Sequence, residues 1–128
     1  MNKQIKVAVS IISFLFLAAC ASNDVGQLKD VNQDEVCQGY TVTYDEADNK
    51  TEVKVFLRFA GPTGTTLKLN GPGSVTLDDT ELAENITKSE GCFYNRVFDG
   101  QMPSGNHVLA FTDYNGKKYT QKFDWNNM

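Results

Sequence analysis

Apolar and polar residues alternate with a period of two along most of the chain from residue 36 onwards. This alternation is typical of β-strands, whose successive side chains point to opposite faces of a sheet. It predicts strands over residues 36–44, 53–59, 65–69, 74–77, 91–98, 107–113 and 118–125. Gly, Pro, Asn and Asp residues interrupt the pattern between most of these segments. Residues 78–90 are acidic and polar, and within them residues 79–84 predict at most one short helical turn.

Asn115 and Gly116 mark a tight turn between the last two predicted strands. Asn-Gly between alternating segments is the strongest short hairpin signal, since both residues of such a two-residue turn need a positive φ. A turn centred there pairs Val108 with Phe123, whereas Leu109 falls on the opposite face of the hairpin. Neither predicted face is purely apolar, so the pattern leaves open which face is buried.

Short strands, frequent turns and the lack of a long helical pattern indicate an all-β domain. We predict a small antiparallel β-sandwich of about seven strands. Residues 111–119 resemble the last hairpin of many bacterial immunoglobulin-like domains, and this resemblance implies an immunoglobulin-like sandwich. The sequence departs from antibody domains, because no Trp lies between Cys37 and Cys92 and Glu90 takes the place of the corner tyrosine.

The N-terminal segment has a different pattern, in which Lys3 and Lys6 precede an apolar run of about 13 residues. This run is too short to cross a bilayer core, which needs about 20 apolar residues. It ends in Leu-Ala-Ala-Cys at residues 17–20. The whole segment resembles the signal peptide of bacterial lipoproteins, in which a large aliphatic and two small residues precede the cysteine that is acylated.

The lipoprotein resemblance implies that residues 1–19 are removed and that Cys20 carries the lipid. The chain then divides into a signal peptide (1–19), a lipid anchor with a flexible tether (20–33) and a β-sandwich domain (34–128). Ala21 after the cysteine resembles an outer-membrane sorting signal, which implies a place in the bacterial cell envelope, facing the periplasm or the cell surface. The alternative is an ordinary secretory peptide that is cleaved at the same small residues.

Two further cysteines remain once Cys20 is assigned to lipid. An even number of cysteines in an oxidising compartment favours a disulfide between Cys37 and Cys92. This bridge would close a loop of about 55 residues and stabilise the domain by roughly 4 kcal/mol on the loop-entropy model. Two buried free thiols are the alternative.

The sequence offers no convincing catalytic or metal-binding set. His107 is the single histidine, no Gly-x-Ser-x-Gly motif is present, and we expect His107 at the surface or rim. Acidic residues gather at positions 45–48 and 78–84, but they lack the spacing of a calcium loop and fit solvated turns. We therefore expect no enzyme activity, no cofactor and no bound metal.

Removal of residues 1–19 leaves ten basic and sixteen acidic residues, a net charge of −6. This balance argues against nucleic acid as a partner. The chain has more aromatic residues than one small core needs, so we expect some of them at a surface that binds protein or glycan. The candidate residues for this interaction surface are Tyr94, Tyr114, Tyr119 and Trp125. The alternative is that these are rim positions of strands, with only a polar tip in water.

The leading functional hypothesis is a non-enzymatic interaction or assembly lipoprotein whose sheet face or edge docks an envelope protein. A lysozyme inhibitor is an alternative, because residues 37–44 are similar to the start of such an inhibitor family and residues 116–119 to its inhibitory loop. That loop lies too near the C-terminus, however, and the inhibitory serine is missing. A cell-wall-acting enzyme or glycan-binding module is the third hypothesis.

Overall fold

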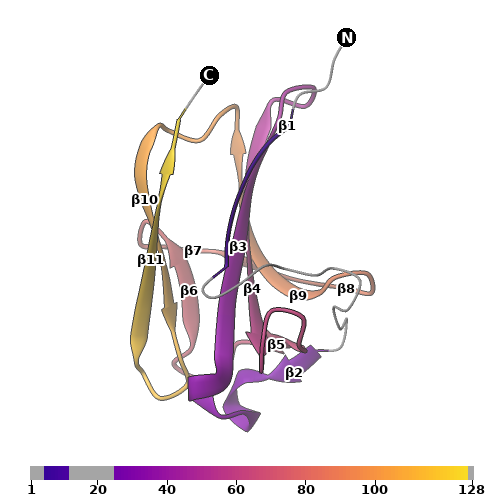
Figure 1. The fold of residues 1–128 in the computed structure, drawn as a ribbon, viewed down its shortest axis with the longest axis vertical. Helices are drawn as coiled ribbons and strands as arrows, with labels where there is room; N and C mark the ends of the chain where they lie inside the picture. Colours follow the sequence, from indigo (N-terminus) through magenta and orange to yellow (C-terminus); the bar gives the residue numbers. More distant parts are fainter. Residues whose placement is uncertain (1–4, 12–24, 127–128) are drawn as a thin grey trace.

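The computed structural model describes residues 5–11 and 25–126, and this part of the chain is all-β, as predicted. Two sheets face each other in Figure 1. The smaller sheet holds β6 (Ser74–Leu77), β7 (Thr80–Glu81), β10 (Gly105–Thr112) and β11 (Lys118–Trp125). The larger sheet holds β1 (Ile5–Ile11), β2 (Val25–Gln27), β3 (Val36–Asp45), β4 (Lys50–Phe59), β5 (Thr66–Lys68), β8 (Ala83–Thr87) and β9 (Gly91–Asp99).

The strand order places β3 near one side of the larger sheet. The order runs β1-β3-β4-β5-β2, and β9 pairs with the first half of β4 and carries β8 on its other side. In the smaller sheet the order is β11-β10-β6-β7. Among the described strands, the pairings are antiparallel except for β2 with β5, which run parallel.

The core lies between the two sheets and follows the period-two pattern. Buried apolar side chains from alternate positions of β3, β4 and β9 meet those of β6, β10 and β11. The rings of Tyr40 in β3 and Phe123 in β11, for example, lie 5.0 Å apart between centroids. In β4 the core residues are Val53, Val55 and Leu57, which are the apolar positions of its alternating sequence.

The segment expected to be a flexible tether is in part folded onto the domain. β2 is followed by two 3-10 turns over Leu28–Asp30 and Gln33–Glu35. Leu28 is fully buried in the core, and Gln33 donates from its side-chain amide to the carbonyl oxygens of Leu28 and Val31. Val25 and Val31 also pack against the core, so this segment, expected to be a tether, belongs to the folded domain from residue 25 onwards.

The acidic stretch after β6 also differs from its prediction. Residues 79–84 form no helical turn; β7 and β8 occupy most of this stretch instead. Asp78 and Asp79 both have positive φ, which turns the chain sharply back onto β6. Hydrogen bonding to β6 and β9 stabilises a short polar segment more than an isolated helical turn would.

The terminal hairpin forms where expected, but its register is shifted by one residue. Phe123 pairs with His107 and not with Val108. The loop spans residues 113–117 and has a positive φ at Gly116 only, so it is not the predicted two-residue turn. The shift places Leu109 and Phe111 on the same inward face as Phe123, and this resolves the mixed faces of the predicted hairpin.

Candidate interaction surface

The four aromatic residues expected at an interaction surface are split between the core and the surface. Tyr94 and Trp125 are only 3% and 4% exposed and belong to the core, so their expected place on the surface was wrong. Tyr114 is 39% exposed in the terminal hairpin loop, and Tyr119 is half-buried beside it. The alternation over residues 91–98 has an aromatic residue on each face, Phe93 and Tyr94, so it does not tell which face is buried.

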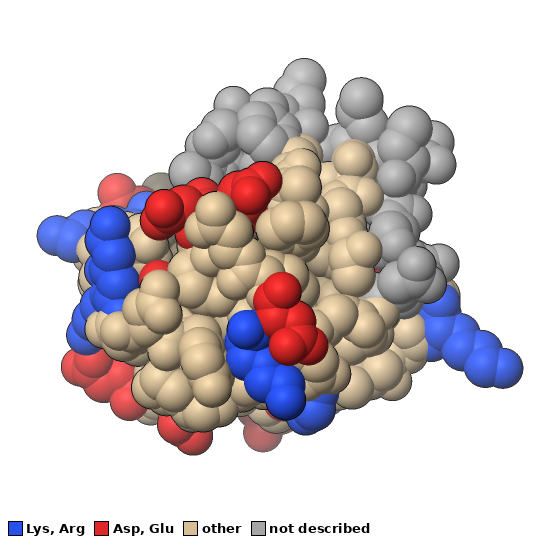
Figure 2. Space-filling model, turned by 90° about the horizontal axis from the view of Figure 1, so that it is seen from below, with Lys and Arg blue, Asp and Glu red and all other residues tan. Residues whose placement is uncertain are grey.

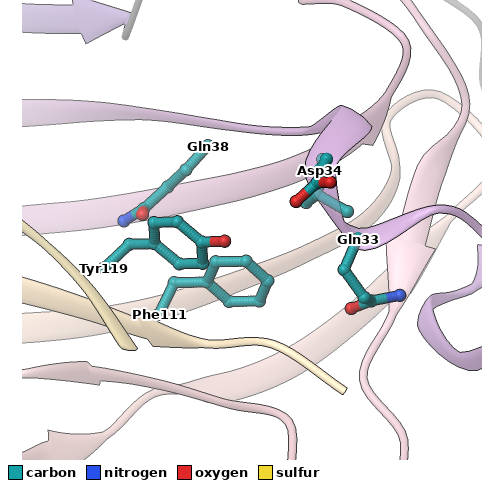
Figure 3. Close-up of a pocket in the computed structure, with 6 residues that line it drawn as sticks. Gln33, Asp34, Gln38, Phe111 and Tyr119 are labelled. Atoms are coloured by element: carbon teal, nitrogen blue, oxygen red, sulfur yellow. The ribbon is translucent and has the colours of Figure 1, made fainter. Parts of the chain in front are cut away.

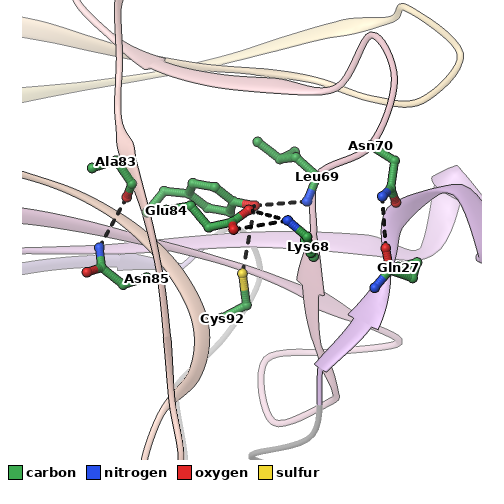
Figure 4. Close-up of polar contacts among 9 residues, drawn as sticks. Gln27, Lys68, Leu69, Asn70, Ala83, Glu84, Asn85 and Cys92 are labelled. Atoms are coloured by element: carbon green, nitrogen blue, oxygen red, sulfur yellow. Dashed lines mark hydrogen bonds and ion pairs between the residues drawn. The ribbon is translucent and has the colours of Figure 1, made fainter.

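The buried Tyr94 forms hydrogen bonds through its hydroxyl group with Leu69 and Glu84, both of which Figure 4 labels. The hydroxyl accepts a hydrogen bond from the Leu69 backbone N–H at 2.8 Å and donates one to Glu84 at 3.0 Å. Glu84 in turn forms an ion pair with Lys68 at 3.0 Å. Burial is the largest cause that raises the pKa of Tyr94 above its ordinary value. This tyrosine therefore serves the fold and presents no binding group.

The predicted disulfide is absent, because Cys37 and Cys92 lie on opposite faces of the larger sheet. Both are free thiols. Cys92 faces the core with Tyr94, whereas Cys37 pairs with Arg58 on the face turned away from the smaller sheet. Burial raises the pKa of both thiols, although Arg58 lowers that of Cys37 in part. Spacing along the chain suggested a bridge that the alternation of side chains forbids.

His107 is buried, and it was expected at the surface or rim. Its Nδ1 lies 2.6 Å from Oδ2 of Asp78 and its Nε2 lies 2.7 Å from the carbonyl oxygen of Pro103. The ring stacks on Phe123 with 5.5 Å between centroids. Asp78 also accepts a hydrogen bond from the Val108 N–H at 2.9 Å. The pair clamps the turn after β6 to β10, and both ring nitrogens are engaged, so neither is left to serve a substrate.

A second aromatic cluster lies on the face of the larger sheet that is turned away from the smaller one. The rings of Phe56 and Phe93 lie 5.7 Å apart, outside the main core. Lys54 Nζ lies 4.5 Å from the Phe93 ring and forms an ion pair with Glu90 at 2.9 Å. Both rings are buried. The cluster links the neighbouring strands β4 and β9 through side chains.

The long strand β3 pairs with β4 on one side and with β1 on the other. β1 runs antiparallel to β3, with Ile5 opposite Asp45 and Ile11 opposite Gly39. β1 lies within the expected signal peptide, whose removal would leave the backbone groups along that side of β3 without a partner strand. An open edge of this kind is a ready template for pairing with another chain.

The other sheet edges carry the features that normally discourage such pairing. β11 has exposed Lys118, Lys122 and Asp124, and β8 has exposed Glu84. β2 and β7 are only three and two residues long. β3, by contrast, has ten residues, no Pro, and no charge before its last residue. Charges, Pro and short length protect edge strands, so β3 has the character of a strand that is paired on both sides.

A small pocket opens between the start of β3 and the terminal hairpin (Figure 3). It has a volume of about 60 Å³ and is lined by Gln33, Asp34, Val36, Gln38, Phe111 and Tyr119. The rings of Phe111 and Tyr119 stack at 5.8 Å and form its apolar wall. Sites for organic ligands span about 300–1,000 Å³, so this pocket suits a single small group and no whole cofactor.

Gln38 is the unusual residue of this pocket. Its side chain points toward Tyr119 in Figure 3 and is only 2% exposed, and neither Oε1 nor Nε2 has a hydrogen-bond partner. A buried polar group without a partner costs about 1–3 kcal/mol. The neighbouring Gln33, by contrast, uses its amide fully, since its Oε1 also accepts from the Tyr114 N–H at 2.8 Å.

Sequence reasoning missed both the β3 edge and Gln38. A signal for each is present, because residues 36–44 carry no charge and Gln38 interrupts the apolar face formed by Val36, Tyr40 and Val42. The expected lipidation site, Cys20, lies outside the described residues. In the described part of the chain, no His, Cys, Asp and Glu side chains gather into a group that suits a metal ion.

Figure 2 shows acidic and basic side chains interspersed among uncharged ones at the end of the domain seen from below. No helix among the described residues is long and apolar enough to cross a membrane. Comparison with known proteins found no matching family model, no matching curated protein and no matching solved structure.

Proposed function

We propose that this protein is a lipid-anchored, non-enzymatic interaction module of the bacterial cell envelope, built on an immunoglobulin-like β-sandwich. The anchor is the acylated Cys20, which holds the protein at the outer membrane. The domain docks a protein partner by adding a strand of that partner to the open side of β3. Main-chain hydrogen bonds supply affinity in this mode of recognition, and pockets for alternate side chains supply specificity.

One observation carries this proposal: β3 is the long strand without protective charges, and its outer neighbour is β1. Tyr40 and Val42 in β3 belong to the core, and the register with β1 covers residues 39–45. Removal of the signal peptide would uncover this edge in a protein already held at the membrane. A partner strand would then restore the lost pairing.

Removal of the leader makes partner binding depend on delivery of the protein to the membrane. Before cleavage, β1 occupies the same edge that a partner strand would use. The unprocessed protein is therefore unable to dock its partner, and only the processed, anchored form exposes the site. A variant that retains the leader supplies the matched negative control.

The experiment places a photocrosslinking amino acid at Thr43 on β3 in the full chain, expressed in a bacterium with two membranes. The matched control places the same group at Thr120 on β11, which is an exposed threonine on a strand with charged neighbours. Cys20→Ser, which leaves the leader in place, is introduced into each. We expect one dominant crosslinked envelope protein from Thr43, little from Thr120, and loss of the Thr43 product in Cys20→Ser.

Two outcomes would overturn the proposal. Equal crosslinking from Thr43 and Thr120 would show that β3 is not the docking edge. A Thr43 product that persists when the leader is retained would show that the partner does not compete with β1. The mass of the N-terminal peptide from the same sample tests acylation of Cys20.

A further inference from the structure

We propose that the pocket at Gln38 is an anchor site for a side-chain carboxamide, from Asn or Gln, carried by the strand that docks on β3. This inference rests on the proposed function and specifies the chemistry of the partner. It identifies the partner segment as an extended strand antiparallel to β3, with apolar residues at the other inward positions and one amide at the position opposite Gln38.

The chemistry follows from the two unpartnered atoms of Gln38. Its Oε1 accepts a hydrogen bond and its Nε2 donates one, and neither is engaged. A carboxylate offers only acceptors and a Lys or Arg side chain offers only donors, so neither satisfies both atoms. A carboxamide presents one acceptor and one donor group in the same plane. It therefore engages both atoms of Gln38 at once, with one hydrogen bond to each.

The walls of the pocket support a small, neutral group. Phe111 and Tyr119 present their stacked rings, and Val36 adds an aliphatic wall. The volume of about 60 Å³ corresponds to about two water molecules at roughly 30 Å³ each. Gln33 has its own amide engaged and only closes one side. Water is the competing occupant, and the experiment below distinguishes it from an amide.

The register of β3 shows how a docked strand reaches the pocket. The pairing with β1 ends at Ile11 opposite Gly39. Gln38 precedes Gly39 in β3, and its side chain lines the pocket between the two sheets. Residues directly opposite each other in an antiparallel pair point to the same face. A docked strand that continues one residue beyond this register therefore places a side chain beside Gln38.

The test uses synthetic peptides with the sequence of residues 3–13, in which the varied position, 12, directly follows the residue that pairs with Gly39. The peptides carry Ile, Asn or Gln at this position, and binding to the processed protein, purified in detergent, is followed by fluorescence anisotropy. We expect the Ile12→Asn or Ile12→Gln peptide to bind roughly tenfold more tightly than the Ile12 peptide. That size follows from the net gain of one or two hydrogen bonds.

The matched protein variant is Gln38→Leu, which keeps the volume of the side chain and removes both polar atoms. It should bind the Ile12 peptide at least as tightly as the amide peptides. Gln38→Met serves if Gln38→Leu fails to fold. An NMR measurement needs no substitution: the side-chain N–H resonances of Gln38 should shift when an amide peptide binds and change little with the Ile12 peptide.

The outcomes separate the anchor site from the proposed function. Equal affinity of the three peptides, or an amide preference that survives in Gln38→Leu, would mean that the pocket holds only water, although strand docking would stand. Failure of every peptide to bind would also overturn the anchor site. The proposed function itself fails if the Thr43 crosslinks are absent, no stronger than those from Thr120, or independent of the leader.

Discussion

Asp113 and Lys117 are joined by two hydrogen bonds across the terminal hairpin loop. The Asp113 N–H donates to the Lys117 carbonyl oxygen at 2.9 Å, and the Lys117 N–H donates to Asp113 Oδ1 at 2.9 Å. The same carboxylate oxygen accepts from the Asn115 N–H at 2.9 Å. The buried Asp113 side chain thus closes the loop and fixes how β10 and β11 pair.

Replacement of Asp113 by Ala should destabilise the processed protein by about 2–4 kcal/mol, because two backbone N–H groups lose a buried, charged acceptor. The free energy of unfolding in urea measures this loss. Asp113→Asn retains an acceptor oxygen and should lose clearly less. An Asp113→Ala variant within about 0.5 kcal/mol of the wild type, the range of ordinary surface substitutions, would show that the loop is held by other contacts.

Asp78 should make the stability of the domain depend on acid pH. Burial tends to raise the pKa of this carboxyl, but hydrogen bonds from His107 and the Val108 N–H outweigh it and hold the pKa below its ordinary value of 3.8. Because the folded-state pKa is the lower one, ionised Asp78 stabilises the fold above about pH 3.8, and this contribution is lost as the pH falls through the folded-state pKa.

Urea unfolding of Asp78→Asn between pH 2 and pH 7 checks this dependence. The variant should be less stable than the wild type at neutral pH, and the difference should shrink at the acid end. Asp99→Asn is the matched control: Lys50 also lowers the pKa of Asp99, but this pair is exposed and screened by water. A difference for Asp78→Asn that stays constant with pH would contradict the assignment.

The thiols of Cys37 and Cys92 should both be free in the processed protein. Intact-mass measurement without reductant should show both hydrogens present, and reductant should leave the urea midpoint unchanged. Burial raises the pKa of both groups, so alkylation should be slower than for an exposed cysteine and should accelerate as the pH rises. Half-buried Cys37 should react first, and Cys92 only on unfolding. A mass lower by two hydrogens would show that the two cysteines form a disulfide.

Leu28 should behave as a core residue although it lies in a polar segment. It is fully buried, and its replacement by Ala should cost about 2–5 kcal/mol of unfolding free energy. The neighbouring exposed Lys29 provides the control, and Lys29→Ala should change stability little. If both substitutions changed the free energy of unfolding by an equally small amount, residues 25–33 would be a flexible tether and not part of the folded domain.

Much of the fold followed from local pattern. The predicted strands at 74–77 and 118–125 coincide with β6 and β11, and the strand predicted over 36–44 lies within β3. Each has alternating side chains between turn residues, and that pattern depends only on the chain itself. The candidate surface was harder to predict, because Tyr94 and Phe93 lie on opposite faces of one strand and the alternation does not tell which face packs against the smaller sheet.

The sequence by itself determined that the protein is all-β, where most strands lie, and which face of β3 and β4 is buried, because a period of two is a property of the local backbone. Tertiary structure decided the rest. The loop closed by Asp113 sets the register of the terminal hairpin one residue away from the predicted one, so other residues than predicted share its inward face. Strand pairing places Cys37 and Cys92 on opposite faces of the larger sheet. The space between the sheets left Gln38 without a partner. These features depend on contacts between distant segments, which a local pattern does not contain.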